Sequence, residues 1–494
     1  MSRSRFLQVA LVVMAAAGSF SLMGCLGKNS LFAGRPFPPS TVLQRVLVAI
    51  QNPTPTSTGE LQIVDARYDI RNSENGKVPA FFISGYKGSL PSYIANYPEQ
   101  QMGYVYGYGD GTFAPVNYSK EAVAGQNITG LPGLSNSIAI TEDGDYAFAA
   151  NQNTQFLTVV DRVAGQVVQL NLPNVYKVAI NPAGTVALAF VQDSNYAYRV
   201  IHLQQPNGTV AVPPTYPTAA TWPKGVSPVD CQPVNLPVYC VVPVLDKHGN
   251  PIAFDRPFNT IFSSDGTTGW LLNCGPECGG AQSSVSFLNV GPLDIYNFPG
   301  STFPGPPPAV PPPTERQRVP VPGGATMALY GNNTLYISGQ QLQPGGLLEG
   351  FMSVMNLTSN KVTAQYPISD GTHTKMLFGD DNTLWIGSQG CQSGYRTAHN
   401  LVSGCLTFFN LANNSVLVEP WYGDLTGLCA ILEWHKMYTA YGGQLHIYAT
   451  TNVGVTTYQS APYSAGSELT NAYVTVHGTA FDVAYMDAPS NAGD

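Results

Sequence analysis

Short apolar runs separated by polar turns cover most of the chain. Residues 138–140 are apolar, a polar turn with Gly144 follows, and residues 146–150 and 156–160 form two further runs. The next block repeats this order around Gly184, 40 positions later. Runs of this length joined by Gly-containing turns predict β-hairpins. A period of roughly 40 to 50 residues with four short strands is typical of a β-propeller blade.

Similar hairpins recur along the rest of the sequence. They pair residues 46–50 with 61–65, 103–106 with 112–118, 269–272 with 285–288, 334–337 with 352–355, 383–386 with 406–409, and 437–440 with 445–448. With the two blocks above, they predict an all-β protein: a single β-propeller of four-stranded blades over residues 41–487. We expect eight blades, or seven if one hairpin is an insertion. Residues 481–485 have no hairpin of their own, so we expect them to pair with the first N-terminal strands and close the ring.

The best-defined repeat resembles a known family. Residues 146–151 read Tyr-Ala-Phe-Ala-Ala-Asn, residues 157–161 read Leu-Thr-Val-Val-Asp, and residues 165–168 read Gly-Gln-Val-Val. This order is similar to the YVTN-type repeat of WD40-like β-propellers. Residues 59–65 match its middle part, and residues 404–410 match more loosely. The resemblance implies the propeller fold. Its members include envelope binding proteins and, in a lactonase-like branch, enzymes, so both classes of function stay open.

Composition narrows the class of protein further. Charged residues make up 11% of the chain, against roughly 25% in an average soluble domain. The 50 Gly and 40 Pro are incompatible with a helical bundle or coiled coil. Hydrophobic residues reach 44%, which is enough for a large core and excludes intrinsic disorder. The net charge of -8 offers no basic surface, so we expect no nucleic-acid partner.

The N-terminal segment has the order of a secretory signal. Arg3 and Arg5 precede an apolar stretch over residues 6–17, and small residues follow. Residues 22–25 read Leu-Met-Gly-Cys, which resembles the lipobox of bacterial lipoproteins.

This lipobox resemblance implies that residues 1–24 are a signal peptide and that Cys25 carries acyl chains such as palmitate. Residues 25–40 would then tether the propeller to the membrane, so we expect the membrane to be one of its partners. Leu26 after the cysteine indicates the outer membrane, at its periplasmic or surface face. We therefore expect a lipid-anchored protein of the bacterial cell envelope. The alternative is a plain secreted protein that is cleaved near Cys25.

Most of the other cysteines occur as close pairs. The pairs are Cys231 with Cys240, Cys274 with Cys278, and Cys391 with Cys405. Each lies in or beside a predicted loop, where a disulfide would reduce the entropy of the unfolded chain. Such bridges indicate an oxidising compartment. Cys429 lies in an apolar stretch, and we interpret it as a buried thiol rather than a nucleophile.

Three insertions interrupt the repeat, and a short tail follows it. The insertions span residues 204–256, 298–322 and 389–403, and the tail spans residues 488–494. The second insertion is Pro-rich and favours extended polyproline II structure. Long loops on one face of a propeller commonly carry its binding function.

Candidate chemistry is sparse. The seven His include no pair at metal-ligand spacing, and no serine-hydrolase motif occurs, so we assign no catalytic residue, metal or cofactor. Tyr104, Tyr106 and Tyr108 belong to a Tyr-rich segment and are candidates for stacking on sugars or peptides. The alternative is that they alternate between core and rim in a strand.

Two functional hypotheses follow. The first is an envelope scaffold that binds a protein, peptide or glycan through loops on one ring face. The second is an envelope enzyme of the lactonase or hydrolase kind, with a metal in the central channel. The fold alone is compatible with both. We favour binding, because no set of acidic and His residues marks a channel site in the sequence.

Overall fold

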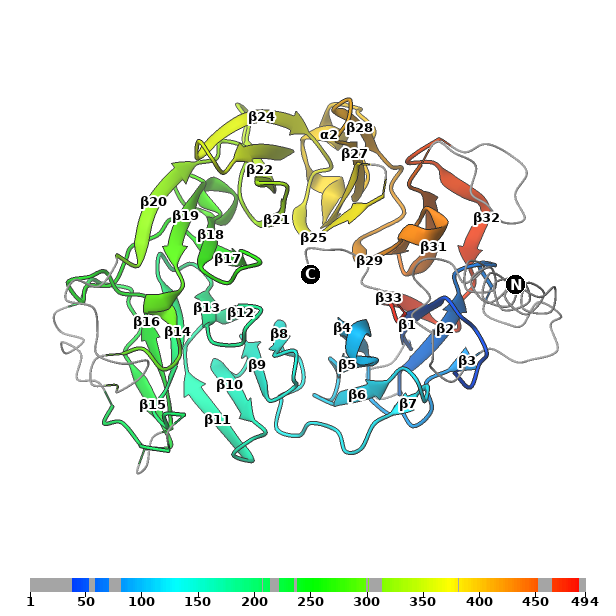
Figure 1. The fold of residues 1–494 in the computed structure, drawn as a ribbon. Coiled ribbons are helices and arrows are strands. Elements are labelled where there is room, and N and C mark those ends of the chain that lie inside the picture. The colour runs from blue at the N-terminus through cyan, green and yellow to red at the C-terminus, as the bar shows by residue number, and fades with distance from the viewer. Residues whose placement is uncertain are drawn as a thin grey trace, which may run out of the picture.

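The computed structural model describes residues 38–487 apart from 53–57, 71–80, 207, 214–221, 235–237, 299–300, 302–312, 381 and 452–463. Its strands form eight sheets arranged around a ring (Figure 1). The prediction of an all-β, eight-bladed propeller is therefore confirmed. The predicted signal peptide, Cys25 and the tail at 488–494 lie outside the described residues.

The first four blades, each from its innermost to its outermost strand, have the following bounds. Blade 1 contains β33 (Thr479–Tyr485), β1 (Arg45–Gln51), β2 (Glu60–Asp65) and β3 (Phe81–Phe82). Blade 2 contains β4 (Pro91–Tyr97), β5 (Met102–Gly107), β6 (Phe113–Asn117) and β7 (Ala122–Val123). Blade 3 contains β8 (Ser137–Ile140), β9 (Tyr146–Asn151), β10 (Phe156–Asp161) and β11 (Gln166–Asn171). Blade 4 contains β12 (Val175–Ile180), β13 (Ala187–Val191), β14 (Ala197–His202), β16 (Tyr239–Pro243) and β15 (Asp230–Gln232).

The other four blades follow the same plan. Blade 5 contains β17 (Pro257–Phe262), β18 (Thr268–Asn273), β19 (Ser284–Asn289) and β20 (Glu315–Pro320). Blade 6 contains β21 (Met327–Gly331), β22 (Thr334–Leu342), β23 (Leu348–Asn356) and β24 (Lys361–Pro367). Blade 7 contains β25 (Thr372–Gly379), β26 (Thr383–Gln389), β27 (Leu406–Asn410) and β28 (Ser415–Val418). Blade 8 contains β29 (Leu425–Ile431), β30 (Lys436–Tyr441), β31 (Gln444–Ala449) and β32 (Glu468–Val474).

Among the described residues, helical structure is confined to short turns between strands. These are η1 (Pro98–Gln100), η2 (Gly275–Cys278), η3 (Gly291–Leu293), η4 (Cys391–Ser393), α2 (Tyr395–Ala398) and η5 (Leu432–Trp434). Within the described part of the chain, no helix is long and apolar enough to cross a membrane.

The alternating direction of the strands gives the ring two different faces. One face carries the loops between second and third strands and the links from each blade to the next, and we call it the link face. The other carries the turns between first and second strands and between third and fourth strands, and we call it the turn face. The innermost strands line the central opening, and each contacts the innermost strand of the next blade (Figure 1).

The hydrophobic core lies between neighbouring sheets rather than on one side of each. Leu157 and Val159 of blade 3 and Ala189 and Val200 of blade 4 belong to one buried cluster. The second and third strands of most blades, such as β13 and β14, are therefore buried on both faces. The outer strand β24 is at least partly exposed along its whole length. This burial explains the short continuous apolar runs in the sequence.

Part of the segment 204–256 belongs to the propeller. Residues 239–243 form β16, the fourth strand of blade 4, and residues 230–232 form β15, which pairs with it at the edge of the sheet. Cys231 and Cys240 stand directly opposite each other in this register. Blade 4 therefore has five strands instead of the expected four.

The ring closes where the two ends of the propeller meet. β33 pairs antiparallel with β1, so the last strand becomes the innermost strand of the first blade. This pairing confirms the expectation for residues 481–485. It also gives β1 a hydrogen-bonded neighbour on both sides.

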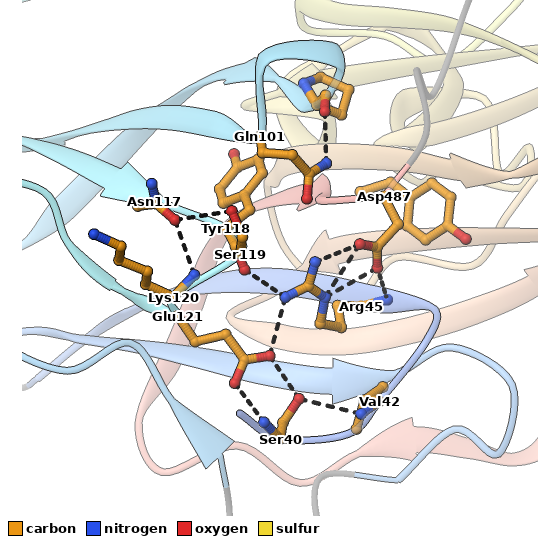
Figure 2. Close-up of polar contacts among 12 residues, drawn as sticks. Ser40, Val42, Arg45, Gln101, Asn117, Tyr118, Ser119, Lys120, Glu121 and Asp487 are labelled. Carbon is orange, nitrogen blue, oxygen red and sulfur yellow. Dashed lines mark hydrogen bonds and ion pairs between the residues drawn. The ribbon is translucent and has the colours of Figure 1, made fainter. Parts of the chain in front are cut away.

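A buried ionic cluster reinforces this closure, as Figure 2 shows. Arg45, at the start of β1, is fully buried and its guanidinium donates to both Asp487 and Glu121. Its backbone N–H also donates to Asp487 at 2.7 Å, and its Nη1 donates to the carbonyl of Tyr118 at 2.6 Å. Ser40 donates its backbone N–H to Glu121 at 2.7 Å. We call Arg45, Glu121 and Asp487 the closure seam, because they join blades 1 and 2 to the end of the ring.

Candidate functional site

The predicted binding tyrosines lie largely inside the protein. Tyr104 and Tyr106 on β5 are buried in the core between blades 2 and 3, and Tyr108 packs against that core. The hydroxyl of Tyr106 donates to the carbonyl of Pro132 at 2.6 Å. Tyr104 and Tyr106 are thus both core residues of the same strand, and a binding role for these tyrosines stays a prediction.

The predicted disulfide bonds are present. They join Cys231 to Cys240, Cys274 to Cys278, and Cys391 to Cys405. The second closes the η2 turn of blade 5, and the third closes the α2 loop of blade 7 (residues 390–405), so both stiffen the link face. Cys429 is buried on β29, as the sequence predicts.

Hydrogen bonds connect these two disulfide-closed loops across blade 6. Glu277, inside the Cys274–Cys278 turn, accepts the backbone N–H of Gln340 at 2.8 Å and its side-chain Nε2 at 3.0 Å. The side-chain oxygen of Gln340 in turn accepts the backbone N–H of Gly371 at 2.8 Å. Blades 5, 6 and 7 are therefore linked by one continuous chain of contacts.

The α2 loop rests on a buried carboxylate. Asp370 is 1% exposed and accepts the backbone N–H groups of Arg396 at 2.7 Å and Gly350 at 2.9 Å. Gly394 lies so close that a Cβ there would meet a carboxylate oxygen of Asp370 at 2.4 Å. The glycine is thus needed for α2 to approach its support.

Burial raises the pKa values of the carboxyl groups that hold these loops. It raises the pKa of Glu277 to about 7, although the two hydrogen bonds from Gln340 oppose the change. Burial also raises the pKa of Asp370, and the hydrogen bonds from the backbone N–H groups of Gly350 and Arg396 oppose this change. Both carboxylates therefore act inside the scaffold, where they hold loops in place.

The link between blades 7 and 8, residues 419–424, lies beside the α2 loop. The hydroxyl of Tyr441 accepts the backbone N–H of Cys405 at 3.0 Å and donates to the carbonyl of Pro420 at 2.7 Å. Gly390 donates its N–H to Asp424 at 2.7 Å. These bonds fix the two segments against each other.

Large apolar side chains are exposed on this braced part of the molecule. They come from the end of β22, the α2 loop and the 419–424 link: Leu342, Leu401, Val402, Trp421 and Tyr422. We call these five residues the link-face surface. Trp421 is 46% exposed and Val402 is 56% exposed. Exposed aromatic and aliphatic groups on a rigid support are typical of protein contact surfaces.

The orientation of Tyr422 is set by neighbouring polar groups. Its ring stacks on His446 with centroids 4.7 Å apart, and its hydroxyl donates to Glu468 at 3.2 Å. His446 contacts the other oxygen of Glu468 at 2.6 Å. Burial and then the charge of Glu468 raise the pKa of nearby Glu419 to about 7. The sequence signal for this site was the Trp-Tyr pair between Pro420 and Gly423, which the sequence analysis missed.

The central channel contains charged side chains from innermost strands. Lys375 Nζ lies 3.1 Å from Asp482, which also accepts the backbone N–H of Ile94 at 2.9 Å. Lys177 lies over the ring of Phe258, 4.8 Å from its centroid. Among the described residues, no three His, Cys, Asp or Glu side chains gather in a way that could hold a metal ion.

Comparison with known proteins supports the fold. No protein-family model matches the sequence, and no curated protein matches it. Among solved structures, the chain is similar to the dihydro-heme d1 dehydrogenase NirN in complex with DHE, with a TM-score of 0.52 and 13% identity over 92% of this chain and 79% of that one.

Two further structures are more distant. Kuenenia stuttgartiensis hydrazine synthase has a TM-score of 0.46 and 12% identity over 73% of this chain and 96% of that one. The β-propeller domain of Myceliophteria thermophila Cps50 (Swd1) has a TM-score of 0.41 and 10% identity over 73% and 97% of the two chains. At 13% identity the similarity to NirN shows the fold alone, and the two more distant structures add no argument.

Proposed function

We propose that this protein is a binding propeller of the cell envelope that docks a partner protein on its link-face surface. The observation that carries the proposal is the combination of exposed apolar side chains with a support that cannot easily move. Trp421 and Tyr422 have few rotatable bonds and offer large contact areas, so ordering them on binding costs little entropy. An isolated exposed Leu would need no explanation, but a group of five on adjoining braced segments does.

The bracing explains how such a surface stays in shape. The Cys391–Cys405 disulfide closes the α2 loop, and Asp370 and Asp424 accept its backbone N–H groups. A preorganised loop loses less conformational entropy when a partner binds, which increases affinity without adding contacts.

The proposed location follows from the N-terminal sequence. Residues 22–25 resemble a lipobox, and acyl chains on Cys25 would hold the propeller at the membrane. The three disulfides fit an oxidising compartment such as the envelope.

Photo-crosslinking tests the docking surface directly. A photoreactive amino acid at Trp421 in the full chain, expressed in the source cell, is expected to give a discrete adduct with one protein. The matched control places the same group at Val163, which is 67% exposed on the turn face. Equal adducts at both positions, or none at Trp421, would contradict the proposal.

Membrane fractionation tests the anchor separately. Cys25→Ser removes the proposed site of acylation, so the protein is expected to move from the membrane fraction to the soluble fraction. Unchanged membrane attachment would rule out the lipid anchor, whatever the crosslinking shows.

A further inference from the structure

A groove runs between the outer parts of blades 5 and 6, from the turn face along the outer strands to Pro322 in the link between these blades. Its first part is a hollow of about 460 Å³. Its second part, of about 550 Å³, continues between the edge strands β20 and β24. Gln317 and Asn360 line both parts, so the groove is continuous and suits an elongated ligand.

The floor of the groove is aromatic. Trp270 of blade 5 stacks on Tyr330 of blade 6 with centroids 5.2 Å apart and an interplanar angle of 28°, and Phe287 lies beside them. Trp270 is 4% exposed, and its indole N–H is a buried donor with no acceptor among the described residues. Tyr330 is partly exposed, so its ring is the part of this floor that a ligand can contact.

Amide side chains form much of the wall. Gln317, Asn333, Asn360 and Gln365 all line the groove, and Asn360 donates to Gln317 at 3.0 Å. An amide offers two donors and an acceptor in one plane. Sugar hydroxyls can meet both kinds of group, and the C–H faces of sugar rings can pack on the aromatic floor.

The lining of the groove has a net positive charge, whereas the whole chain has a net negative charge. Arg316, Arg318 and Lys361 line it together with a single acid, Asp265, in a chain with 22 Lys and Arg against 30 Asp and Glu. Arg318 is already paired with Glu315 at 2.9 Å. Arg316 donates to the hydroxyl of Thr268 at 2.9 Å and forms no ion pair within the described residues, nor does Lys361. Two cations are therefore available for a ligand's anionic groups.

From this combination we propose that the groove between blades 5 and 6 binds an acidic oligosaccharide that carries carboxylate groups, as uronic acids do. Arg316 and Lys361 contact the carboxylates, and the amides contact the hydroxyl groups. The partly exposed ring of Tyr330, which stacks on the buried Trp270, packs on a sugar face. The groove shares no residue with the link-face surface, so its test is independent of the proposed protein partner.

Titration calorimetry with the purified full-length protein tests this site. The probes are an oligogalacturonate hexasaccharide and a neutral glucan hexasaccharide of the same length. We expect the acidic probe alone to bind, with an affinity that decreases as salt concentration rises. The double variant Arg316→Gln with Lys361→Gln should weaken binding by at least about tenfold, because charge-assisted hydrogen bonds are lost.

Two further variants make the test specific. Tyr330→Leu removes the partly exposed ring and keeps an apolar side chain, so it should weaken binding by about fivefold to tenfold while the protein stays folded. Lys87→Gln with Lys120→Gln removes the same amount of charge from blade 2 and its link, and should leave binding unchanged. Equal binding of both hexasaccharides, or equal affinity of the groove variants and the blade 2 control, would overturn the proposal.

Discussion

The closure seam and the disulfide-closed loops hold the propeller by different means. Arg45 and Asp487 are 442 positions apart in sequence, and buried charges and hydrogen bonds join them. Cys274 and Cys278 are 4 positions apart and Cys391 and Cys405 are 14 apart, and covalent bonds join them. The seam secures the whole ring, whereas the disulfides set the shape of local surface. Global stability and local rigidity are thus assigned to separate regions.

The seam is expected to give the largest effect. Arg45→Met leaves the carboxylates of Asp487 and Glu121 buried without their cation, which should lower the free energy of unfolding by about 3–5 kcal/mol. Urea denaturation measures this loss. The matched control is Arg318→Met, which breaks a partly exposed pair with Glu315 and should cost no more than about 1 kcal/mol. Similar losses in both variants would show that the seam does not secure the ring.

Loss of the disulfide that closes the α2 loop should give the second-largest effect on stability. The double variant Cys391→Ser with Cys405→Ser releases a closed loop of 14 positions, for which chain entropy gives a loss of about 3 kcal/mol at most. Limited proteolysis should show faster cleavage after Arg396, because the released loop is more mobile. Cleavage after Arg396 at the wild-type rate would contradict the expectation that the disulfide keeps this loop rigid.

The smallest effect concerns pH. The pKa of Glu277 is about 7 in the folded protein, against 4.5 as its ordinary value, because burial favours the neutral acid. The folded state therefore binds the proton more tightly. This contribution to stability is present in full below about pH 4.5 and is lost as pH rises to about 7. Wild type should thus lose on the order of 2 kcal/mol relative to Glu277→Gln between pH 4.5 and pH 8, measured by urea midpoints. The surface variant Glu99→Gln is the control, and parallel pH profiles for wild type and Glu277→Gln would contradict the expectation.

The sequence predicted the fold because its determinants are local. Each hairpin is specified by a short apolar run and a turn, so the period and the eight blades follow from the pattern. The three disulfides were predictable for the same reason, since their partners lie near each other in the chain.

Contacts between blades were harder to predict. Alternation along β5 does not reveal that Tyr104 and Tyr106 are buried, because both faces of a propeller sheet pack against neighbours. Glu277 pairs with Gln340, 63 positions away, and no sequence pattern in either segment predicts this pairing. Arg45 was the one visible clue to the seam, as a charge at the start of an apolar strand.

The chain order of blade 1 has a consequence for biosynthesis. β33 is the last strand of the ring in chain order, yet it occupies the innermost place in the first blade (Figure 1). Until it arrives, one edge of β1 has unpaired N–H and C=O groups that could join another chain. A nascent or truncated chain without β33 therefore exposes this edge, and the ring can close only after β33 has been made.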